Sequence, residues 1–456
     1  MSLQYSISNP YTGELIGDYR YANSDKISEI IAILKTGQLT QKKTAAHERA
    51  DILRKLAGLL EENAEELAQL ITSETGKTIS DSRVEMTRAI NATLASGEEA
   101  RQISGEALDS DCYAPTRNKI GIVMWRPLGT VLCITPFNFP INIAMHKIGP
   151  AFAAGNSIMF KPGPQNTATA TMLTQLCHEA GMPKDVLHMC IPDVPDMAAL
   201  IAHKDIAAIN FTGGTAAADS IAMAAGYKKL LLELGGNDPL IIMPDGDIKG
   251  AVNAAINQRF ATAGQRCTAA KRIFVHQDVY GEFKDALVSA SRKLIVGDPR
   301  DEDTFVGPVI NTRAADEVKQ RIEQAVEQGA NVLLGNKREG NIIYPTILDN
   351  VADNCDLMVE ETFGPVMPLR SFSSIEELVP LINNSAYGLQ GGVFTQNFSV
   401  AKFLFEELDL GTLAMNDGPG FRTEHFPFGG VKASGVGREG IKYAIREMSF
   451  TKALVI

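Results

Sequence analysis

From residue 119 onward, short apolar runs typical of buried strands alternate with stretches of helical periodicity. We predict strands at 120–127, 129–134, 157–160, 186–191 and 206–211. Helices are predicted between them at 141–154, 167–180 and 197–203. Because strands and helices alternate in this way, the economical arrangement is a parallel sheet built from β-α-β units.

A second alternating block begins near Glu233 and repeats the layout of the first. Its predicted strands are 240–243, 272–275 and 331–334, and its predicted helices are 248–261, 279–293 and 314–328. With 456 residues, the chain is longer than one ordinary hydrophobic core supports. The predicted fold class is therefore α/β, with two Rossmann-like three-layer domains.

The two ends of the chain follow different patterns. Residues 5–22 alternate around a turn at 9–13 and predict a β-hairpin, whereas 24–105 predicts helices. The last residues, 451–456, predict a strand. A terminal strand leaves a free edge, and we expect it to pair with the 119–127 ribbon of a neighbouring subunit.

Composition argues against several classes of function. The net charge of −11 is spread along the chain, so no nucleic-acid or anionic-membrane surface is expected. The six cysteines lack metal-type spacing, which predicts reduced thiols and no bound metal. No apolar run approaches about eighteen residues and there is no charged leader, so we expect a cytoplasmic protein.

Cys267 follows Gly264-Gln265-Arg266 on a predicted turn and precedes the strand predicted at 272–275. Backbone amides and nearby cations at such a turn would lower the pKa of the thiol and make it a nucleophile. A buried free cysteine is the alternative, and it is the commoner fate of this residue type. The stretch alone leaves both interpretations open.

Three segments contain glycines that are typical of nucleotide-binding loops. Gly213 and Gly214 follow a predicted strand and precede a helix, where backbone amides would face the pyrophosphate of a dinucleotide. An ordinary strand-to-helix turn explains them equally well. Segment 75–78 lacks the spaced first glycine of a phosphate loop, and 435–440 has GxGxxG spacing without a clear preceding strand. We predict no nucleotide site at these last two segments.

Three polar residues lie at positions suited to catalysis or binding. Asn138 lies in a loop stiffened by prolines, where its amide would donate to a developing oxyanion, although a turn role fits as well. Lys161 ends a predicted strand and would reach ribose or phosphate oxygens unless it is merely solvated. Glu233 lies inside an apolar run, so burial would raise its pKa towards the range of a general base. A salt-bridged strand end is the alternative for Glu233.

These segments, completed by 360–365 and 427–435, resemble the aldehyde dehydrogenase superfamily in their order along the chain. The resemblance covers essentially the whole sequence. Its most specific part is Glu-Leu-Gly-Gly at 233–236, followed at the family's spacing by Gly-Gln-Arg-Cys at 264–267. In this context Cys267 is predicted to be a nucleophile.

The resemblance implies that Cys267 attacks an aldehyde, and that the Asn138 amide and the Cys267 backbone N–H hold the oxyanion. Hydride would then pass to the nicotinamide of NAD or NADP, and Glu233 would deprotonate the water that hydrolyses the thioester. Members that transfer acyl groups to coenzyme A typically lack this glutamate, so a free acid is the expected product. Lys147 and Glu439 match positions that the family links to proton relay.

For the cofactor, the resemblance implies that Lys161 and Glu361 hold the two riboses and that Gly213 and Gly214 face the pyrophosphate. The full set of implied cofactor contacts is Ile134, Thr135, Pro136, Phe137, Lys161, Gly213, Gly214, Leu234, Glu361 and Phe363. Pro164 stands where NAD-preferring members often place an acid for the 2′-hydroxyl group. The choice between NAD and NADP therefore stays open.

Arg266, directly before the nucleophile, resembles the branch of lactaldehyde, phosphonoacetaldehyde, sulfolactaldehyde and non-phosphorylating glyceraldehyde-3-phosphate enzymes. Arg88 and Arg422 would be further cationic contacts for a phosphonate, sulfonate or carboxylate. Ordinary ion pairs are the alternative for these arginines. We predict NAD(P)-dependent oxidation of a small anionic or hydroxylated aldehyde. The alternatives are a succinate-semialdehyde-type or broad-range enzyme, a coenzyme A-acylating enzyme, and a non-catalytic relative.

The resemblance also divides the chain. It implies a dinucleotide-binding domain from 1–110 and 128–235, a catalytic domain from 236–430, and an oligomerisation arm from 111–127 and 440–456. The expected assembly is a homodimer or a homotetramer.

Overall fold

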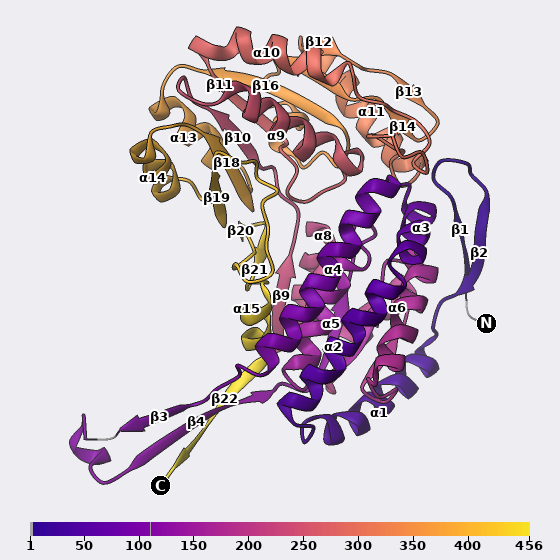
Figure 1. Ribbon diagram of the computed structural model, residues 1–456, viewed down its shortest axis with the longest axis vertical. Coiled ribbons are helices and arrows are strands. Elements are labelled where there is room, and N and C mark those ends of the chain that lie inside the picture. The colour runs from indigo at the N-terminus through magenta and orange to yellow at the C-terminus, as the bar shows by residue number, and fades with distance from the viewer. Residues whose placement is uncertain (1–2, 110) are drawn as a thin grey trace.

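The structure is a computed structural model that describes residues 3–109 and 111–456. Figure 1 shows two α/β bodies, one built mainly from the first half of the chain and the other from the second half. An N-terminal hairpin lies at one side, and a long β arm projects from the first body. The predicted domain boundary at Ser110 lies outside the described residues.

The first body contains a six-stranded sheet in the order β21-β9-β8-β5-β6-β7. Its strands are β5 (Thr130–Ile134), β6 (Ser157–Lys161), β7 (Leu187–Met189), β8 (Ile206–Thr212), β9 (Lys229–Glu233) and β21 (Gly435–Val436). Strands β5 to β8 pair in parallel, as predicted; β9, which was not predicted, is parallel to β8, and β21 is antiparallel to β9. The parallel strands therefore end at one common edge, which is where ligands bind in open α/β sheets.

Helices cover both faces of this sheet, and the alternation along β5 shows why. Val131 and Cys133 pack into one hydrophobic cluster, whereas Leu132 and Ile134 pack into another, because successive strand side chains point to opposite faces. One face carries α2 (Ala46–Glu62), α3 (Ala64–Thr75), α4 (Ile79–Ala100), α5 (Asn142–Ala153), α6 (Thr167–Ala180) and α15 (Ile441–Glu447). The other face carries α1 (Ser24–Gln41), α7 (Val194–Ala202) and α8 (Thr215–Ala225).

The second body contains a seven-stranded sheet in the order β12-β15-β16-β11-β10-β18-β19. Its strands are β10 (Pro239–Ile242), β11 (Arg272–His276), β12 (Asn331–Leu334), β15 (Thr346–Asp349), β16 (Val366–Phe372), β18 (Gln390–Phe394) and β19 (Thr412–Met415). All pair in parallel except β12, which is antiparallel to β15. Its helices are α9 (Ile248–Phe260), α10 (Gln277–Ser291), α11 (Thr312–Glu327), α13 (Ile375–Asn383) and α14 (Phe398–Glu407).

Short elements complete the chain. The N-terminal hairpin is β1 (Gln4–Ser8) with β2 (Leu15–Arg20), as predicted. Two further small sheets pair β13 (Arg338–Glu339) with β14 (Ile342–Ile343) and β17 (Tyr387–Gly388) with β20 (Val431–Lys432). The short helical segments are η1 (Ala114–Thr116), η2 (Pro164–Asn166), η3 (Ala261–Gly264) and α12 (Asp356–Val359).

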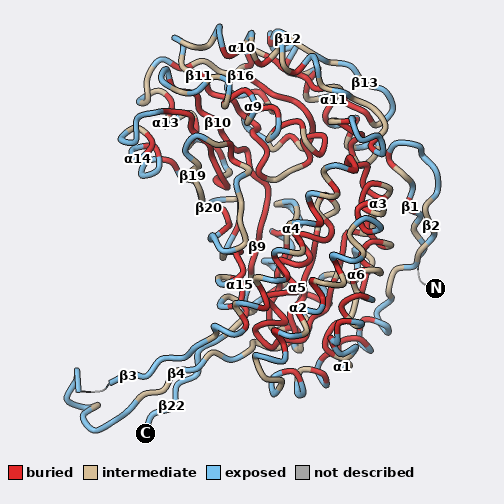
Figure 2. The backbone as a smooth tube through the Cα atoms, in the orientation of Figure 1, coloured by how far each residue is buried: buried red, intermediate tan, exposed pale blue. Residues whose placement is uncertain are grey.

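The β arm consists of β3 (Glu106–Asp109), β4 (Ile120–Pro127) and β22 (Ser449–Val455). β22 pairs with β4 of its own chain, so the predicted pairing with the ribbon of a neighbouring subunit is wrong. The physical reason is that α15 returns the chain to the base of β4, where Leu128 N–H donates to the Met448 carbonyl at 3.4 Å. Figure 2 shows that the arm is largely exposed, in contrast to the two buried cores. Within the described residues, no helix is long and apolar enough to cross a membrane.

Candidate active site

The three residues predicted to carry the chemistry come from both bodies. Asn138 follows β5 and Glu233 ends β9, so both lie at the edge where the parallel strands of the first sheet end. Cys267 lies between η3 and β11 of the second body. Asn138 Nδ2 donates to the carbonyl of Gln265 at 2.7 Å, which ties the loop of Asn138 to the loop of Cys267. Figure 1 shows β9 running from the first body towards the second.

The turn before Cys267 has an uncommon backbone conformation. Thr262, Ala263 and Gly264 have φ angles of 55°, 52° and 71°, all in the left-handed region. A Cβ atom on Gly264 would lie 2.3 Å from the carbonyl oxygen of Gly364, so a side chain cannot be accommodated there. The glycine of the Gly-Gln-Arg-Cys segment is therefore explained by a close backbone approach.

Burial dominates the electrostatics of Cys267. Although the residue is partly exposed, the surrounding protein raises the pKa of its thiol to about 11. Lys271 and Arg422 lower this pKa, but burial outweighs them. The predicted lowering of the thiol pKa is therefore wrong for this structure. At neutral pH the thiol must lose its proton to a base before it can attack.

Lys271 is a buried cation that was not among the predicted site residues. Its Nζ donates to the backbone carbonyls of Arg266 at 3.0 Å and Cys267 at 2.5 Å. It also forms a salt bridge with Glu361 at 3.1 Å. Lys271 thereby joins the loop of the cysteine to the loop of a predicted cofactor contact.

Asn138 is buried, and its Oδ1 has no hydrogen-bond partner in the described part of the chain. An amide nitrogen carries two N–H donors, and the Gln265 carbonyl accepts one of them. The other N–H can donate to an oxygen bound near Cys267. This arrangement is compatible with the implied oxyanion site.

Glu233 is 3% exposed, and its Oε2 has no partner among the described residues. Its Oε1 faces Gly429, where an added Cβ would lie 2.8 Å away. Burial raises the pKa of Glu233 well above its usual value, and the negative charge of Glu439 raises it further. The raised pKa agrees with the apolar sequence around this residue and suits a general base.

Lys147 and Glu439 form a fully buried network beside Glu233. Lys147 Nζ contacts Glu439 Oε1 at 2.7 Å and Asn210 Oδ1 at 2.6 Å. Arg422 Nη2 donates to Glu439 Oε2 at 2.7 Å. The segment 435–440 therefore contributes a buried carboxylate to the site. Its GxGxxG spacing begins in β21, which is antiparallel to β9, so no parallel strand leads through these glycines into α15 as in a dinucleotide-binding loop.

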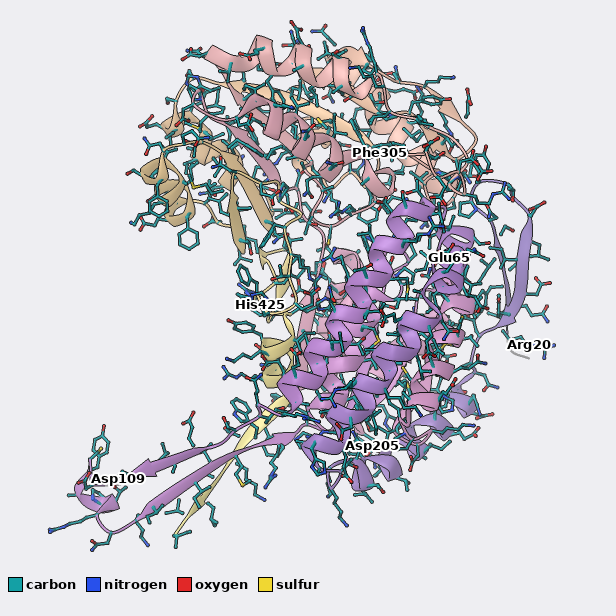
Figure 3. The ribbon with its side chains drawn as sticks, in the orientation of Figure 1. Arg20, Glu65, Asp109, Asp205, Phe305 and His425 are labelled. Atoms are coloured by element: carbon teal, nitrogen blue, oxygen red, sulfur yellow. The ribbon has the colours of Figure 1, made fainter. Side chains whose placement is uncertain are left out.

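Arg88, Arg266 and Arg422 lie close to one another. Burial lowers the pKa of Arg88 to about 10, and the positive charges of Arg422 and Arg266 contribute to this lowering. The Nε atoms of Arg266 and Arg422 are buried without a partner within the described residues. Arg422 stacks on Phe428 with its guanidinium carbon 3.8 Å from the ring centre. Figure 3 labels His425, in the same loop as Arg422, near the junction of the two bodies.

His146 is a site residue that sequence reasoning missed. It is 1% exposed, and neither ring nitrogen has a partner in the described residues. Burial and the charges of Arg422 and Arg88 lower its pKa well below the usual value, so the ring is neutral. Its position next to Lys147 on α5 was the available signal.

The predicted cofactor residues line the ends of the parallel strands. Ile134 and Lys161 are neighbours across β5 and β6. Gly214 precedes α8, and an added Cβ there would meet nothing within 4 Å. The amide end of α8 is therefore open to an anion. Burial lowers the pKa of Lys161, which ends β6 at the same edge.

The two phenylalanines of the predicted cofactor set, Phe137 and Phe363, contact each other. The rings of Phe137 and Phe363 are 6.0 Å apart in an edge-on arrangement. A cavity of about 160 Å³ lies beside them, lined also by Gln265, Thr362 and Arg321. Buried hydroxyl groups without partners in the described chain, such as Thr135 Oγ1 and Thr212 Oγ1, lie along the strand ends. These unsatisfied groups fit a bound dinucleotide.

Fold and site together define the class of protein as an oxidoreductase that uses NAD or NADP. A family model described as the aldehyde dehydrogenase family matches residues 2–454. The chain belongs to this family. The predicted family, the predicted α/β fold and the predicted NAD(P)-dependent oxidation of an aldehyde are confirmed.

Three relatives illustrate the similarity. The chain is 66% identical over 456 residues to the sulfoacetaldehyde dehydrogenase of Neptuniibacter caesariensis, with 100% of both chains covered. It is 37% identical to the 3-sulfolactaldehyde dehydrogenase of Priestia megaterium, covering 99% of this chain and 94% of the relative. The crystal structure of an NADP-dependent glyceraldehyde-3-phosphate dehydrogenase from Bacillus halodurans, complexed with NADP, matches with a TM-score of 0.97. Its identity is 35%, covering 100% of this chain and 96% of that one.

Proposed function

We propose that this aldehyde dehydrogenase oxidises sulfoacetaldehyde to sulfoacetate, through a thioester on Cys267 that water hydrolyses. The observation that carries the proposal is the group of three partly buried arginines, Arg88, Arg266 and Arg422. The Nε–H donors of Arg266 and Arg422 are buried without a partner among the described residues. A sulfonate can accept hydrogen bonds from several such donors at once. The 66% identity to a sulfoacetaldehyde dehydrogenase over the whole chain supports the same substrate.

The first chemical step forms a bond between sulfur and carbon. Glu233, whose Oε2 is free of partners among the described residues, is our candidate to take the proton of the Cys267 thiol. The thiolate then attacks the aldehyde carbon, and the carbonyl oxygen becomes an oxyanion. The second Asn138 N–H and the Cys267 backbone N–H stabilise this oxyanion. When bound, NAD(P)⁺ supplies the hydride acceptor.

Hydrolysis releases the acid from the thioester. Glu233 in its ionised form removes a proton from water, the resulting hydroxide attacks the acyl carbon, and the carbon–sulfur bond breaks. The raised pKa of Glu233 makes its carboxylate a stronger base than an exposed one. We assign Lys147 and Glu439 to the relay that passes the proton away from Glu233. The two side chains form a buried pair, and their charges shift the pKa of Glu233.

For the cofactor, we propose that both NAD and NADP are accepted. Lys161 is placed to bind ribose or phosphate oxygens, and Pro164 at the start of η2 carries no negative charge that would repel a 2′-phosphate. Gly213 and Gly214 face the pyrophosphate, and Glu361 and Phe363 the nicotinamide ribose. The remaining contacts are Ile134, Thr135, Pro136, Phe137 and Leu234.

For the assembly, we propose a homodimer or a homotetramer built through the β arm. The arm exposes apolar side chains such as Ile120 at 57% and Leu454 at 58%, which a partner would cover. We retain the division into a dinucleotide-binding domain (1–110 and 128–235), a catalytic domain (236–430) and an oligomerisation arm (111–127 and 440–456).

The test is a panel of aldehydes assayed with NAD⁺ and NADP⁺ in the absence of coenzyme A and phosphate. Sulfoacetaldehyde, 3-sulfolactaldehyde, succinate semialdehyde and neutral propanal are compared by kcat/KM. We expect sulfoacetaldehyde to exceed propanal by about 10²-fold, because charged hydrogen bonds contribute about 1.5–3 kcal/mol each. Equal values for both would remove the arginines from substrate binding, and a strict need for coenzyme A would remove water as the acyl acceptor.

A further inference from the structure

No function was predicted for segment 76–85, although residues 76–78 at its start resemble part of a phosphate loop. Residues 76–78 connect α3 to α4, and residues 79–85 form the first two turns of α4. We call this segment the corner. We propose that Asp81 is a positioning residue which, together with the buried Lys77–Glu85 pair, holds the loops of Cys267 and Asn138 in register. The inference rests on the proposed roles of these two residues, but not on the identity of the aldehyde.

Local sequence explains the corner. Gly76 ends α3 with a φ of 72°, a left-handed conformation that glycine adopts without penalty. Thr78 then begins α4, and its hydroxyl accepts from Asp81 N–H at 3.3 Å. This N-cap places Asp81 in the first turn of α4, at the end of the helix that faces the second body.

Glu85 binds the backbone at the start of α5, directly after the loop of Asn138. Its Oε1 accepts from Ile141 N–H at 2.9 Å and from Asn142 N–H at 3.1 Å. Its Oε2 pairs with Lys77, and both of these side chains are at most 1% exposed. Lys77 Nζ also lies 3.7 Å from the centre of the Phe139 ring. The residues on the C-terminal side of Asn138 are therefore fixed by buried charges from the corner.

Asp81 binds Thr262 in the left-handed turn that precedes Cys267. Its Oδ2 accepts from Thr262 N–H at 2.8 Å and from Thr262 Oγ1 at 3.1 Å. Left-handed backbone is disfavoured for a β-branched residue such as threonine, so contacts from outside the turn must maintain it. Asp81 supplies such contacts from the other body. Its charge also attracts Arg266, which directly precedes Cys267.

The two sides are linked because Asp81 and Glu85 lie four residues apart on one helix. Such residues share a helix face, so α4 presents one carboxylate to each loop. The backbone of α4 is rigid on the scale of a hydrogen bond, and the separation of the two loops is therefore set by the helix. At the active site, the hydrogen bond of 2.7 Å from Asn138 Nδ2 to the Gln265 carbonyl connects the same two loops directly.

Other contacts near the corner allow a matched control. Arg83 pairs with Glu65 of α3 and, at 2.7 Å, with Glu302 of the second body. Figure 3 labels Glu65 and Phe305 on the two sides of this junction. The Glu302 side chain is 67% exposed, so its ion pair contributes little. Glu302→Ala therefore removes a contact between the bodies without touching either loop.

The experiment measures the first burst of NADH and the KM with propanal, a neutral aldehyde that does not need the arginines. We expect Asp81→Ala to slow the burst by about 10–100-fold, since misplacement by about 1 Å costs up to about 10²-fold. KM for propanal should change by less than about twofold, because a positioning defect affects the reacting geometry more than binding. Glu302→Ala should match the wild type in both quantities.

Two variants separate positioning from general destabilisation. Asp81→Asn keeps an oxygen that accepts from Thr262 N–H, so its burst should stay within about threefold of the wild type. In the Asp81→Ala background, Thr262→Gly should recover at least about threefold of the lost rate, because glycine adopts positive φ freely. If Asp81→Ala is poorly folded by circular dichroism, the double variant Asp81→Ala/Thr262→Gly is compared with Thr262→Gly alone, where the turn no longer needs the contacts of Asp81. The two bursts should agree within about threefold, and a difference of about tenfold or more would overturn the positioning role.

An unchanged burst in Asp81→Ala would overturn the positioning role. So would a burst in Asp81→Asn as slow as that of folded Asp81→Ala, or a KM that rises in parallel with the loss of rate. Cys267→Ala is assayed alongside. Turnover by that variant would refute the proposed thioester chemistry, whereas an unchanged burst in Asp81→Ala alone would leave it standing.

Discussion

Two groups of charges lie around the proposed active site, and they differ in how their hydrogen bonds are satisfied. On one side, Lys147 and Glu439 form a short pair, and Asn210 and Arg422 complete their contacts. On the other side, Arg88 and Arg266 form no salt bridge within the described residues. Charges whose hydrogen bonds are already satisfied have little capacity left for a ligand, whereas partly buried cations without a salt-bridge partner keep donors for the anionic group of a substrate. The difference indicates which side binds the substrate.

The largest effect should come from the residue that both groups share. Cys267→Ala removes the sulfur, so aldehyde oxidation should fall by about 10⁴-fold or more, as expected when a nucleophile is deleted. Steady-state NADH production with sulfoacetaldehyde and with propanal measures this. The exposed cysteine at 112 provides the control, since Cys112→Ala should leave the rate unchanged. Near-normal turnover without Cys267 would mean that the two groups do not face a common nucleophile.

The group of paired charges, Lys147 and Glu439, can be tested through Glu233, because the charge of Glu439 raises the pKa of Glu233. Glu233→Gln cannot accept a proton, so we expect the steady rate to fall by about 10²–10⁴-fold, the usual contribution of a general base. Because Glu233 is also the proposed acceptor of the thiol proton, the first burst of NADH should be slower than in the wild type. Acylated enzyme should still accumulate at Cys267, because the thioester is no longer hydrolysed. Intact-mass analysis of quenched enzyme detects that adduct. Unimpaired steady turnover would show that hydrolysis does not depend on this side of the site.

The unpaired side can be tested through Arg266. Arg266→Ala should lower kcat/KM for sulfoacetaldehyde by about 10–100-fold, because one or more charged hydrogen bonds are lost. The value for propanal should change by less than about threefold. Arg266→Lys keeps the charge but loses the planar fork, and an intermediate value is expected. Equal losses for both aldehydes would make Arg266 structural and erase the contrast between the two groups.

The alternating pattern of strands and helices was sufficient to predict β5, β6, β7 and β8 of the first sheet and part of the second sheet. It did not reveal β18, because Gly391 and Gly392 weaken the apolar signal of this strand. The structure shows why they are present, since a Cβ on Gly392 would lie 2.4 Å from the Asp417 carbonyl oxygen. Such a close approach between distant segments leaves no periodic signature in the sequence.

The candidate site was predictable where residues follow strands or lie in a motif, as for Asn138 and Cys267. The roles of Asp81 and Lys271 were not, because each acts through contacts with segments far away in the chain. The pKa of the Cys267 thiol was also mispredicted. Nearby cations can be inferred from sequence, but the depth of burial that outweighs them depends on tertiary packing.

The smallest effect concerns the balance between burial and cations at Cys267. Because the pKa of the thiol is about 11, the thiolate fraction should rise about tenfold per pH unit between pH 7 and 10. Site-specific mass spectrometry of iodoacetamide labelling, without cofactor, follows this rise, and it separates Cys267 from the exposed Cys112. Arg422 lowers the pKa of the thiol, so Arg422→Gln should raise it and slow labelling at pH 8. A labelling rate that is already constant above pH 8 would mean that the cations outweigh burial. The arginines would then serve the nucleophile as well as the substrate, and the two groups would no longer be distinct in function.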